Sequence, residues 1–186
     1  MHPPDCACQL HLGRREVIRA AFGLTCLAAA PAAVAAGAGA RSLNLVAINT
    51  RETFRGVYWR DGRYDPAALQ RLNWLLRDHR RGAATRMDPR LFDLLHTIGL
   101  RLQTGGAPID IISAYRTPQT NAAKRARSRA VAKNSLHMEG EAVDIRIEGR
   151  SAAGIANLAA AMGAGGVGLY RRDDFVHVDI GPPRRW

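Results

Sequence analysis

The hydrophobic positions beyond residue 40 follow periods that predict alternating strands and helices. Residues 43–49 and 53–59 form two short strand-like segments on either side of the turn 50–52, which is the pattern of a β-hairpin. The same reasoning predicts strands over 108–113 and 142–147 and a closing hairpin formed by 166–170 and 175–180. These segments supply the sheet of the domain.

Two helices are marked by the same start signal, an Asp followed by Pro at 65–66 and 88–89. Asp is a favoured N-cap, and Pro fits the first helical position because the N–H it lacks would be unpaired there anyway. Leucine stripes follow both signals, and an Ala-rich helix is expected from 151 to about 162. Helices and strands in this irregular order predict an α+β fold with a mainly antiparallel sheet and flanking helices.

The first forty residues have the composition of an export signal. Arg14-Arg15 precede mostly small or apolar residues from 20 to 36, and small residues up to Ala40 supply a cleavage site. The paired arginines and the mild hydrophobicity are typical of a twin-arginine signal. An uncleaved membrane anchor and a lipoprotein signal at Cys26 are weaker alternatives. We predict a signal over 1–40, a separate exported domain over 41–186, and a periplasmic location with membrane contact only through an uncleaved signal.

Charge and cysteine content narrow the partner and the chemistry. The chain has 27 Lys and Arg against 16 Asp and Glu, a net charge of +11, and its basic residues are densest between 124 and 133. A basic protein attracts polyanions. Export argues against nucleic acid and leaves anionic cell-wall polymers and lipid headgroups. All three cysteines precede residue 27, so a metal in the exported domain must be bound by His and carboxylate side chains.

Two histidines of the exported domain stand near carboxylates. His137 precedes Asp144 by seven positions across a glycine-containing turn, and His177 and Asp179 fall on one face of a strand whose other face is apolar. Two imidazoles and a carboxylate suit Zn²⁺, and three protein ligands leave a fourth position for water. Each half has a plainer alternative: His137 as a turn or core histidine, and His177 with Asp179 as a buried hydrogen-bonded pair.

Together these residues match a known constellation: His-x-x-Gly-x-Ala-x-Asp at 137–144, acid-x-x-His at 174–177 and Ser-x-Tyr-Arg at 113–116. The constellation resembles the zinc peptidases of the D-Ala-D-Ala metallopeptidase group, which share a fold with the hedgehog signalling domain. Three further segments are similar to the YcbK/MepK-like branch of the murein endopeptidases: 72–80, 131–137 and 175–181. The resemblance covers nearly all of 41–186 and implies that this segment is a zinc peptidase domain with one Zn²⁺ per chain, bound by His137, Asp144 and His177.

Peptide hydrolysis needs further groups besides the metal. The family pattern places the general base three positions before the last histidine, at Asp174. Asp174 and His177 would face opposite sides of a regular strand, so a bend is expected there; Asp179 is the alternative base, or a partner that orients an imidazole. Arg116 is expected to stabilise negative charge on the substrate's carbonyl oxygen or to bind a substrate carboxylate. Three residues are expected to help position substrate: Ser113, Gln119 and Ser135.

The resemblance implies a zinc-dependent murein endopeptidase that hydrolyses peptide cross-links of peptidoglycan with metal-activated water. Cross-links of the 3-3 and 4-3 types both remain open. One alternative is a D,D- or L,D-carboxypeptidase or dipeptidase that trims stem peptides by the same metal chemistry. Another is a noncatalytic zinc-binding module that binds the cell wall. We expect a monomer.

Overall fold

The computed structural model describes residues 39–128 and 131–186, which belong to the second of two compact units of the chain, Val34–Trp186. The predicted signal lies outside the described residues except for its last two positions. No helix in the described part of the chain is long and apolar enough to cross a membrane.

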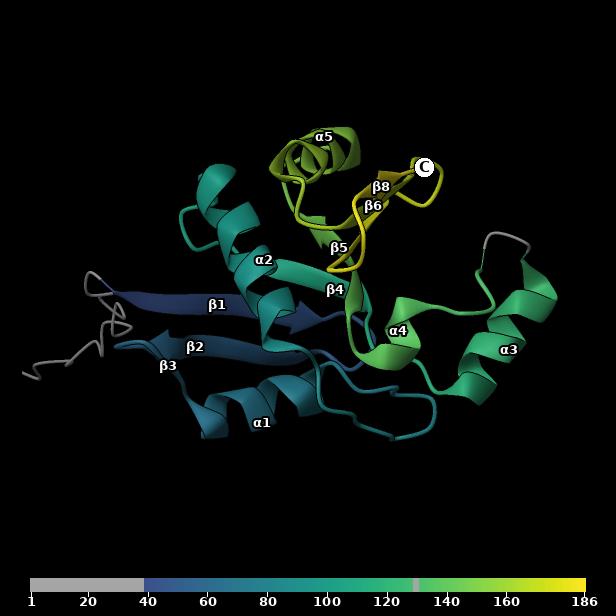
Figure 1. Cartoon of the computed structure of the whole chain (residues 1–186), viewed down its shortest axis with the longest axis horizontal. Helices are drawn as coiled ribbons and strands as arrows, with labels where there is room; N and C mark the ends of the chain where they lie inside the picture. Colours follow the sequence, from purple (N-terminus) through teal and green to yellow (C-terminus); the bar gives the residue numbers. More distant parts are fainter. Residues whose placement is uncertain (1–38, 129–130) are drawn as a thin grey trace, which may run out of the picture. The chain divides into compact units, whose positions relative to one another are not determined.

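Eight strands of the described residues form one mixed sheet in the order β3-β2-β1-β4-β5-β7-β6-β8 (Figure 1). They are β1 (Ala40–Ala47), β2 (Glu52–Arg60), β3 (Arg63–Tyr64), β4 (Ile109–Ser113), β5 (Ala142–Ile147), β6 (Gly166–Tyr170), β7 (Phe175–Asp179) and β8 (Arg184–Arg185). β1 runs parallel to β4 and β6 runs parallel to β8, while the other neighbours are antiparallel. The predicted α+β class with a mainly antiparallel sheet is confirmed.

The helices of the described residues are α1 (Pro66–Leu75), α2 (Pro89–Arg101), α3 (Pro118–Arg127), α4 (Leu136–Glu139) and α5 (Ala152–Met162). The carboxylates of Asp65 and Asp88 accept hydrogen bonds from backbone N–H groups at the starts of α1 and α2, and Pro follows each cap. Both predicted helix starts are therefore confirmed. The Ala-rich helix is α5, which begins after the N-cap Ser151.

Two helices that carry site residues, α3 and α4, were not predicted from the sequence. Where α4 holds His137, only a glycine-containing turn was expected. After Arg116 only a basic stretch was noted, whereas α3 begins there with Thr117 as N-cap and Pro118 at the first helical position. The hydroxyl of Thr117 accepts a hydrogen bond from the N–H of Thr120. This is the same cap-and-proline signal as in α1 and α2, but it is followed by polar and basic residues instead of a leucine stripe.

Alternation along β5 and β7 places the core side chains on one face of the sheet and the potential metal ligands on the other. Val143 and Ile145 of β5 and Val176 and Val178 of β7 join the hydrophobic core, against which α5 packs. The residues between them, including Asp144 and His177, therefore lie on the opposite face. Burial of each such aliphatic side chain contributes about 1.5–3 kcal/mol, so a slip by one residue, which would exchange the two faces, is strongly disfavoured.

Candidate metal centre

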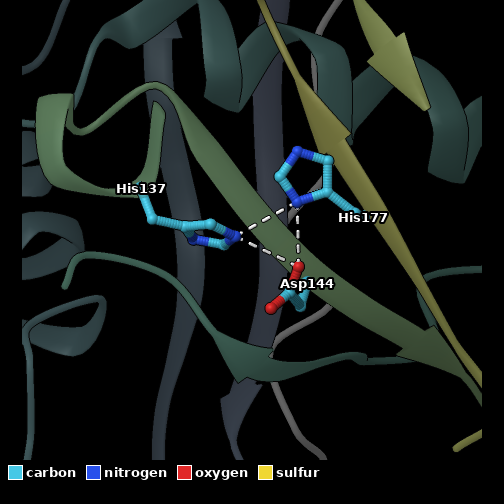
Figure 2. Close-up of side chains that lie close together, drawn as sticks. All are labelled: His137, Asp144 and His177. Carbon is cyan, nitrogen blue, oxygen red and sulfur yellow. Dashed lines mark hydrogen bonds and ion pairs between the residues drawn. The ribbon is translucent and has the colours of Figure 1, made fainter. Parts of the chain in front are cut away.

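Three side chains from separate elements point toward one another (Figure 2). Asp144 of β5 and His177 of β7 are directly paired residues of neighbouring strands, so their side chains lie side by side. His137 belongs to α4, which Gly140 ends in a left-handed conformation with φ of 76°. A Cβ at Gly140 would lie 2.8 Å from the carbonyl oxygen of Arg86. The motif therefore needs glycine there to turn the chain from α4 into β5.

The three potential ligand atoms form a small, nearly equilateral triangle. His137 Nε2 lies 3.1 Å from His177 Nδ1 and 3.2 Å from Asp144 Oδ1, and His177 Nδ1 lies 3.0 Å from the same Oδ1. Zn²⁺ binds such atoms at about 2.0–2.1 Å, so two ligands of a tetrahedral site are about 3.3 Å apart. The residues are buried and their spacing fits a bound Zn²⁺ with three protein ligands.

Hydrogen bonds fix the proton on the outer nitrogen of each imidazole. His137 Nδ1 lies 2.6 Å from the carbonyl oxygen of Ala114, which can only accept, so Nδ1 carries the proton. His177 Nε2 lies 2.9 Å from Asp179 Oδ2 and donates to that carboxylate in the same way. His137 Nε2 and His177 Nδ1 are thereby left as acceptors beside the Asp144 oxygen, and His137 Nε2 accepts a hydrogen bond from Arg116 Nη2 at 2.9 Å. Three acceptors that face one another at this spacing call for a cation between them.

The protonation tendencies of the three residues suit a metal site. Burial lowers the pKa of His137 and keeps its imidazole neutral. Burial opposes ionisation of Asp144, but His137, His177 and Arg116 hold the pKa of its carboxyl well below its usual range. Burial also opposes protonation of His177, yet its hydrogen bonds with Asp144 and Asp179 raise the pKa of its imidazole. A proton on His177 is therefore the competitor that a metal ion must displace.

Asp179 is fully buried and uses both oxygens to hold its neighbours. Oδ1 accepts from the backbone N–H groups of Gly166 and Gly181, each at 2.9 Å, and both oxygens accept from the guanidinium of Arg184. Burial opposes its ionisation, but the hydrogen bonds from His177, Arg184 and the two backbone groups outweigh it and lower the pKa of Asp179. A carboxylate with these five hydrogen bonds has little capacity for another proton, so the geometry favours the orienting role over that of the base.

Arg116 lies beside the ligand triangle and is itself held in place. Its Nη2 donates to Asp144 Oδ2 at 2.6 Å and its Nε donates to the hydroxyl of Ser113 at 3.1 Å. Its backbone N–H donates to the carbonyl oxygen of His137 at 3.1 Å. The structure thus places Ser113 against Arg116, where it fixes the orientation of the guanidinium.

The expected bend before β7 is present at Asp174, which has a φ of 50°. Its side chain is 66% exposed and has one carboxylate oxygen 3.7 Å from Arg146 Nε. The preceding residue, Asp173, lines the cavity that His137, Asp144 and His177 also line, whereas Asp174 does not line it. Of the residues expected to position substrate, Ser135 is buried and lines this cavity. Gln119 is exposed on α3 and lies outside the lining set.

The cavity has a volume of about 300 Å³ and contrasting walls. One wall is aromatic and was not predicted from the sequence. Trp186 lies against the ring of His177 with ring centroids 5.2 Å apart, and the ring of Tyr170 stacks on that of Phe175 with centroids 4.4 Å apart. Trp186 Nε1 donates to the hydroxyl of Tyr170 at 3.3 Å. The short strand β8 brings Trp186 there, and two residues are too few for a periodic signal. Four further lining residues with polar or charged side chains were also not assigned to the site from the sequence: Lys124, Asn134, Asp173 and Arg184.

Comparison with known proteins agrees with this geometry. Residues 35–186 match the family described as peptidoglycan L,D-endopeptidase MepK. A protein of Haemophilus influenzae named probable peptidoglycan L,D-endopeptidase MepK is 38% identical over 166 residues, which cover 89% of each chain. The peptidoglycan L,D-endopeptidase MepK of Escherichia coli K12 is 44% identical over 147 residues, or 78% of this chain and 80% of that protein. The family match and these identities show that the chain belongs to the MepK family of peptidoglycan L,D-endopeptidases.

Proposed function

We propose that this chain is a zinc-dependent endopeptidase that hydrolyses L,D-peptide bonds in the cross-links of peptidoglycan. The observation that carries the proposal is the convergence of His137 Nε2, His177 Nδ1 and Asp144 Oδ1 at 3.0–3.2 Å beside an open cavity. The names of the relatives support the substrate class. Zn²⁺ held by these atoms would supply a Lewis acid and lower the pKa of bound water to about 7.

The neighbouring groups preorganise this site before substrate binds. The carbonyl oxygen of Ala114 and the carboxylate of Asp179 hold the two imidazoles in the tautomers that a metal needs. Arg116, fixed by Ser113 and Asp144, places a positive charge beside the ligand triangle, where the substrate's carbonyl oxygen gains negative charge. Ser135 lines the same cavity, and this supports its proposed role in hydrogen-bonding substrate.

We assign the general base to Asp174. Its place three residues before His177 and the left-handed bend at Asp174 support the assignment, and its exposed carboxylate must turn into the cavity during catalysis. Asp173 is the alternative because it already lines the cavity. Asp174→Asn should lower kcat by about 10²- to 10⁴-fold with zinc content unchanged. If Asp173→Asn alone causes that loss, the base is Asp173.

Purified sacculi test the function directly. An L,D bond joins the L centre of one residue to the D centre of the next, as in a 3-3 cross-link, whereas the bond of a 4-3 cross-link joins two D centres. We expect the zinc-loaded protein to convert 3-3 dimers to monomers, His137→Ala to be inactive and unable to retain zinc, and a chelator to abolish activity until zinc is restored. Release of single D-amino acids would indicate the carboxypeptidase alternative, and sacculus binding with unchanged muropeptides would indicate a noncatalytic wall-binding module.

We further propose that residues 1–40 direct export to the periplasm by the twin-arginine route and that the domain acts as a monomer. Peptidoglycan as the substrate supports export, since the cross-links lie outside the inner membrane. Arg14→Lys combined with Arg15→Lys should retain the protein in the cytoplasmic fraction on cell fractionation. Sedimentation equilibrium of the exported protein should give the mass of one chain.

A further inference from the structure

Lys124 brings a positive charge to the cavity that the proposed mechanism does not use. It lies on α3, is partly buried, and lines the same cavity as the three potential metal ligands. Its neighbours on the helix, Arg125 and Arg127, are exposed. Among the described residues of the basic run, Lys124 is therefore the cationic residue that reaches the site.

The ammonium group of Lys124 lacks an acidic partner among residues 39–128 and 131–186. The ion pairs of the site join other groups: Arg116 with Asp144, and Arg184 with Asp179. Burial lowers the pKa of Lys124, and the charges of Arg116 and Arg80 lower it further, while the more weakly acting Asp144 and Asp78 oppose them. A desolvated cation among other cations favours an anionic ligand.

Arg116 is less available for such a ligand. Its Nη2 and Nε already donate to Asp144 and Ser113, which fix the guanidinium against the ligand triangle. Lys124 has three donors on a flexible stem, and its ammonium group makes no such bonds to the described residues. A negative group that enters the cavity can therefore pair with Lys124 without breaking a contact of the resting site.

The substrate class supplies an anion at a fixed position. In an L,D bond, the D residue provides the scissile nitrogen, and the carbon that bears this nitrogen also bears the residue's own carboxyl group. That carboxyl is free when the residue ends a stem peptide or is the D centre of a cross-linking diamino acid. It is the negative charge closest to the bond on its leaving side.

We propose that Lys124 binds the free carboxylate next to the scissile nitrogen and so makes the site selective for peptides that carry it; this inference rests on the proposed function. Lys124 thus determines specificity for substrates with this carboxylate. It positions the amine side of the substrate, while the residues around Asp144 act on the carbonyl. A carboxamide at the same place accepts a hydrogen bond but lacks the charge, so it binds less tightly.

The test uses two synthetic L,D-linked peptides that differ only in a carboxylate or a carboxamide on the D residue. The zinc-loaded full chain should show a kcat/KM about 10- to 100-fold higher for the carboxylate, the range expected for a hydrogen bond to a charged group. Lys124→Met should remove that preference by slowing cleavage of the carboxylate peptide alone. Lys133→Met is the matched control, because Lys133 is exposed and outside the lining set, and it should keep the preference.

Calorimetric binding of the same two peptides to the His137→Ala protein separates this inference from the proposed function. A carboxylate preference that Lys124→Met removes in this background supports the inference even if the wild-type protein cleaves neither peptide. A preference that persists in the Lys124→Met protein would overturn it. An equal loss for both peptides would also overturn it, since it would indicate a structural role for Lys124 or a carboxylate elsewhere in the substrate.

Discussion

Replacing Asp179 by Asn tests whether the buried carboxylate sets the tautomer of a metal ligand. The substitution keeps the size of the side chain but replaces one acceptor oxygen by an NH₂ donor. In one orientation this donor faces His177 Nε2 and Arg184 Nη2, and in the other it faces the N–H groups of Gly166 and Gly181. In both orientations the new NH₂ group therefore faces another hydrogen-bond donor.

The contact between two donors is removed with the least change in structure if His177 changes its tautomer. If Nε2 gives up its proton and accepts from the new NH₂ group, the proton moves to Nδ1, the atom that faces Asp144. A protonated Nδ1 cannot bind a metal. Loss of such an orienting partner typically lowers metal affinity 10- to 100-fold, or about 1.4–2.7 kcal/mol. Removing one partner of a buried ion pair costs about 3–5 kcal/mol of folding free energy, and we expect the lower end because the side chain of Arg184 is 43% exposed and can be solvated.

Two measurements separate these effects. Competition with a chromophoric chelator gives the loss of zinc affinity, and urea unfolding of the zinc-free protein gives the loss of folding free energy. Asp65→Asn is the matched control, because it makes the same chemical change at a helix N-cap where Asn is equally favourable. Nitrogen-15 NMR of the imidazoles reports the tautomer. An Asp179→Asn protein that binds zinc as tightly as wild type, with the proton still on His177 Nε2, would refute the reasoning.

Two further predictions concern the supports of the site. Gly140→Ala should destabilise the fold and reduce zinc affinity, because its left-handed φ disfavours alanine and the added Cβ would meet the Arg86 carbonyl at 2.8 Å; we expect at least about 1 kcal/mol in urea unfolding. Asp78 is buried; its burial opposes ionisation, but hydrogen bonds from Thr120, Thr117 and backbone groups lower the pKa of Asp78. Its carboxylate therefore contributes stability above the unfolded-state pKa of about 3.9, and this contribution falls as the pH drops toward the folded-state pKa. Asp78→Asn should lower the free energy of unfolding at pH 7 by more than at pH 3, and equal losses would contradict this.

Elements with strong local signals could be predicted from the sequence. The two Asp-Pro helix starts and the alternation along 142–147 and 175–180 identified real elements. Helix α3 has the same cap signal but only two buried residues, Thr120 and Asn121, so it has no apolar stripe. It was missed for that reason, and Lys124 was then counted only as part of a basic run.

The contacts between distant residues could not be derived from periodicity. Trp186 reaches the ring of His177 because β8 pairs with β6, and Arg184 reaches Asp179 through the same pairing. Alternation assigns a residue to a face of a strand, but it does not identify the neighbouring strand. That choice depends on the packing of the whole sheet against its helices.

The sequence by itself determined which residue types could bind a metal and the strand face on which His177 lies. Residue type limited any metal site to His and carboxylate ligands. Alternation placed His177 and Asp179 on the face of their strand opposite its core residues. Only the tertiary structure decided that His177 meets Asp144, 33 positions away, that Ala114 and Asp179 fix the two tautomers, and that Lys124 faces the same cavity. The physical reason is that periodicity acts within one element, whereas convergence of side chains requires the long-range strand pairing that burial of the core stabilises.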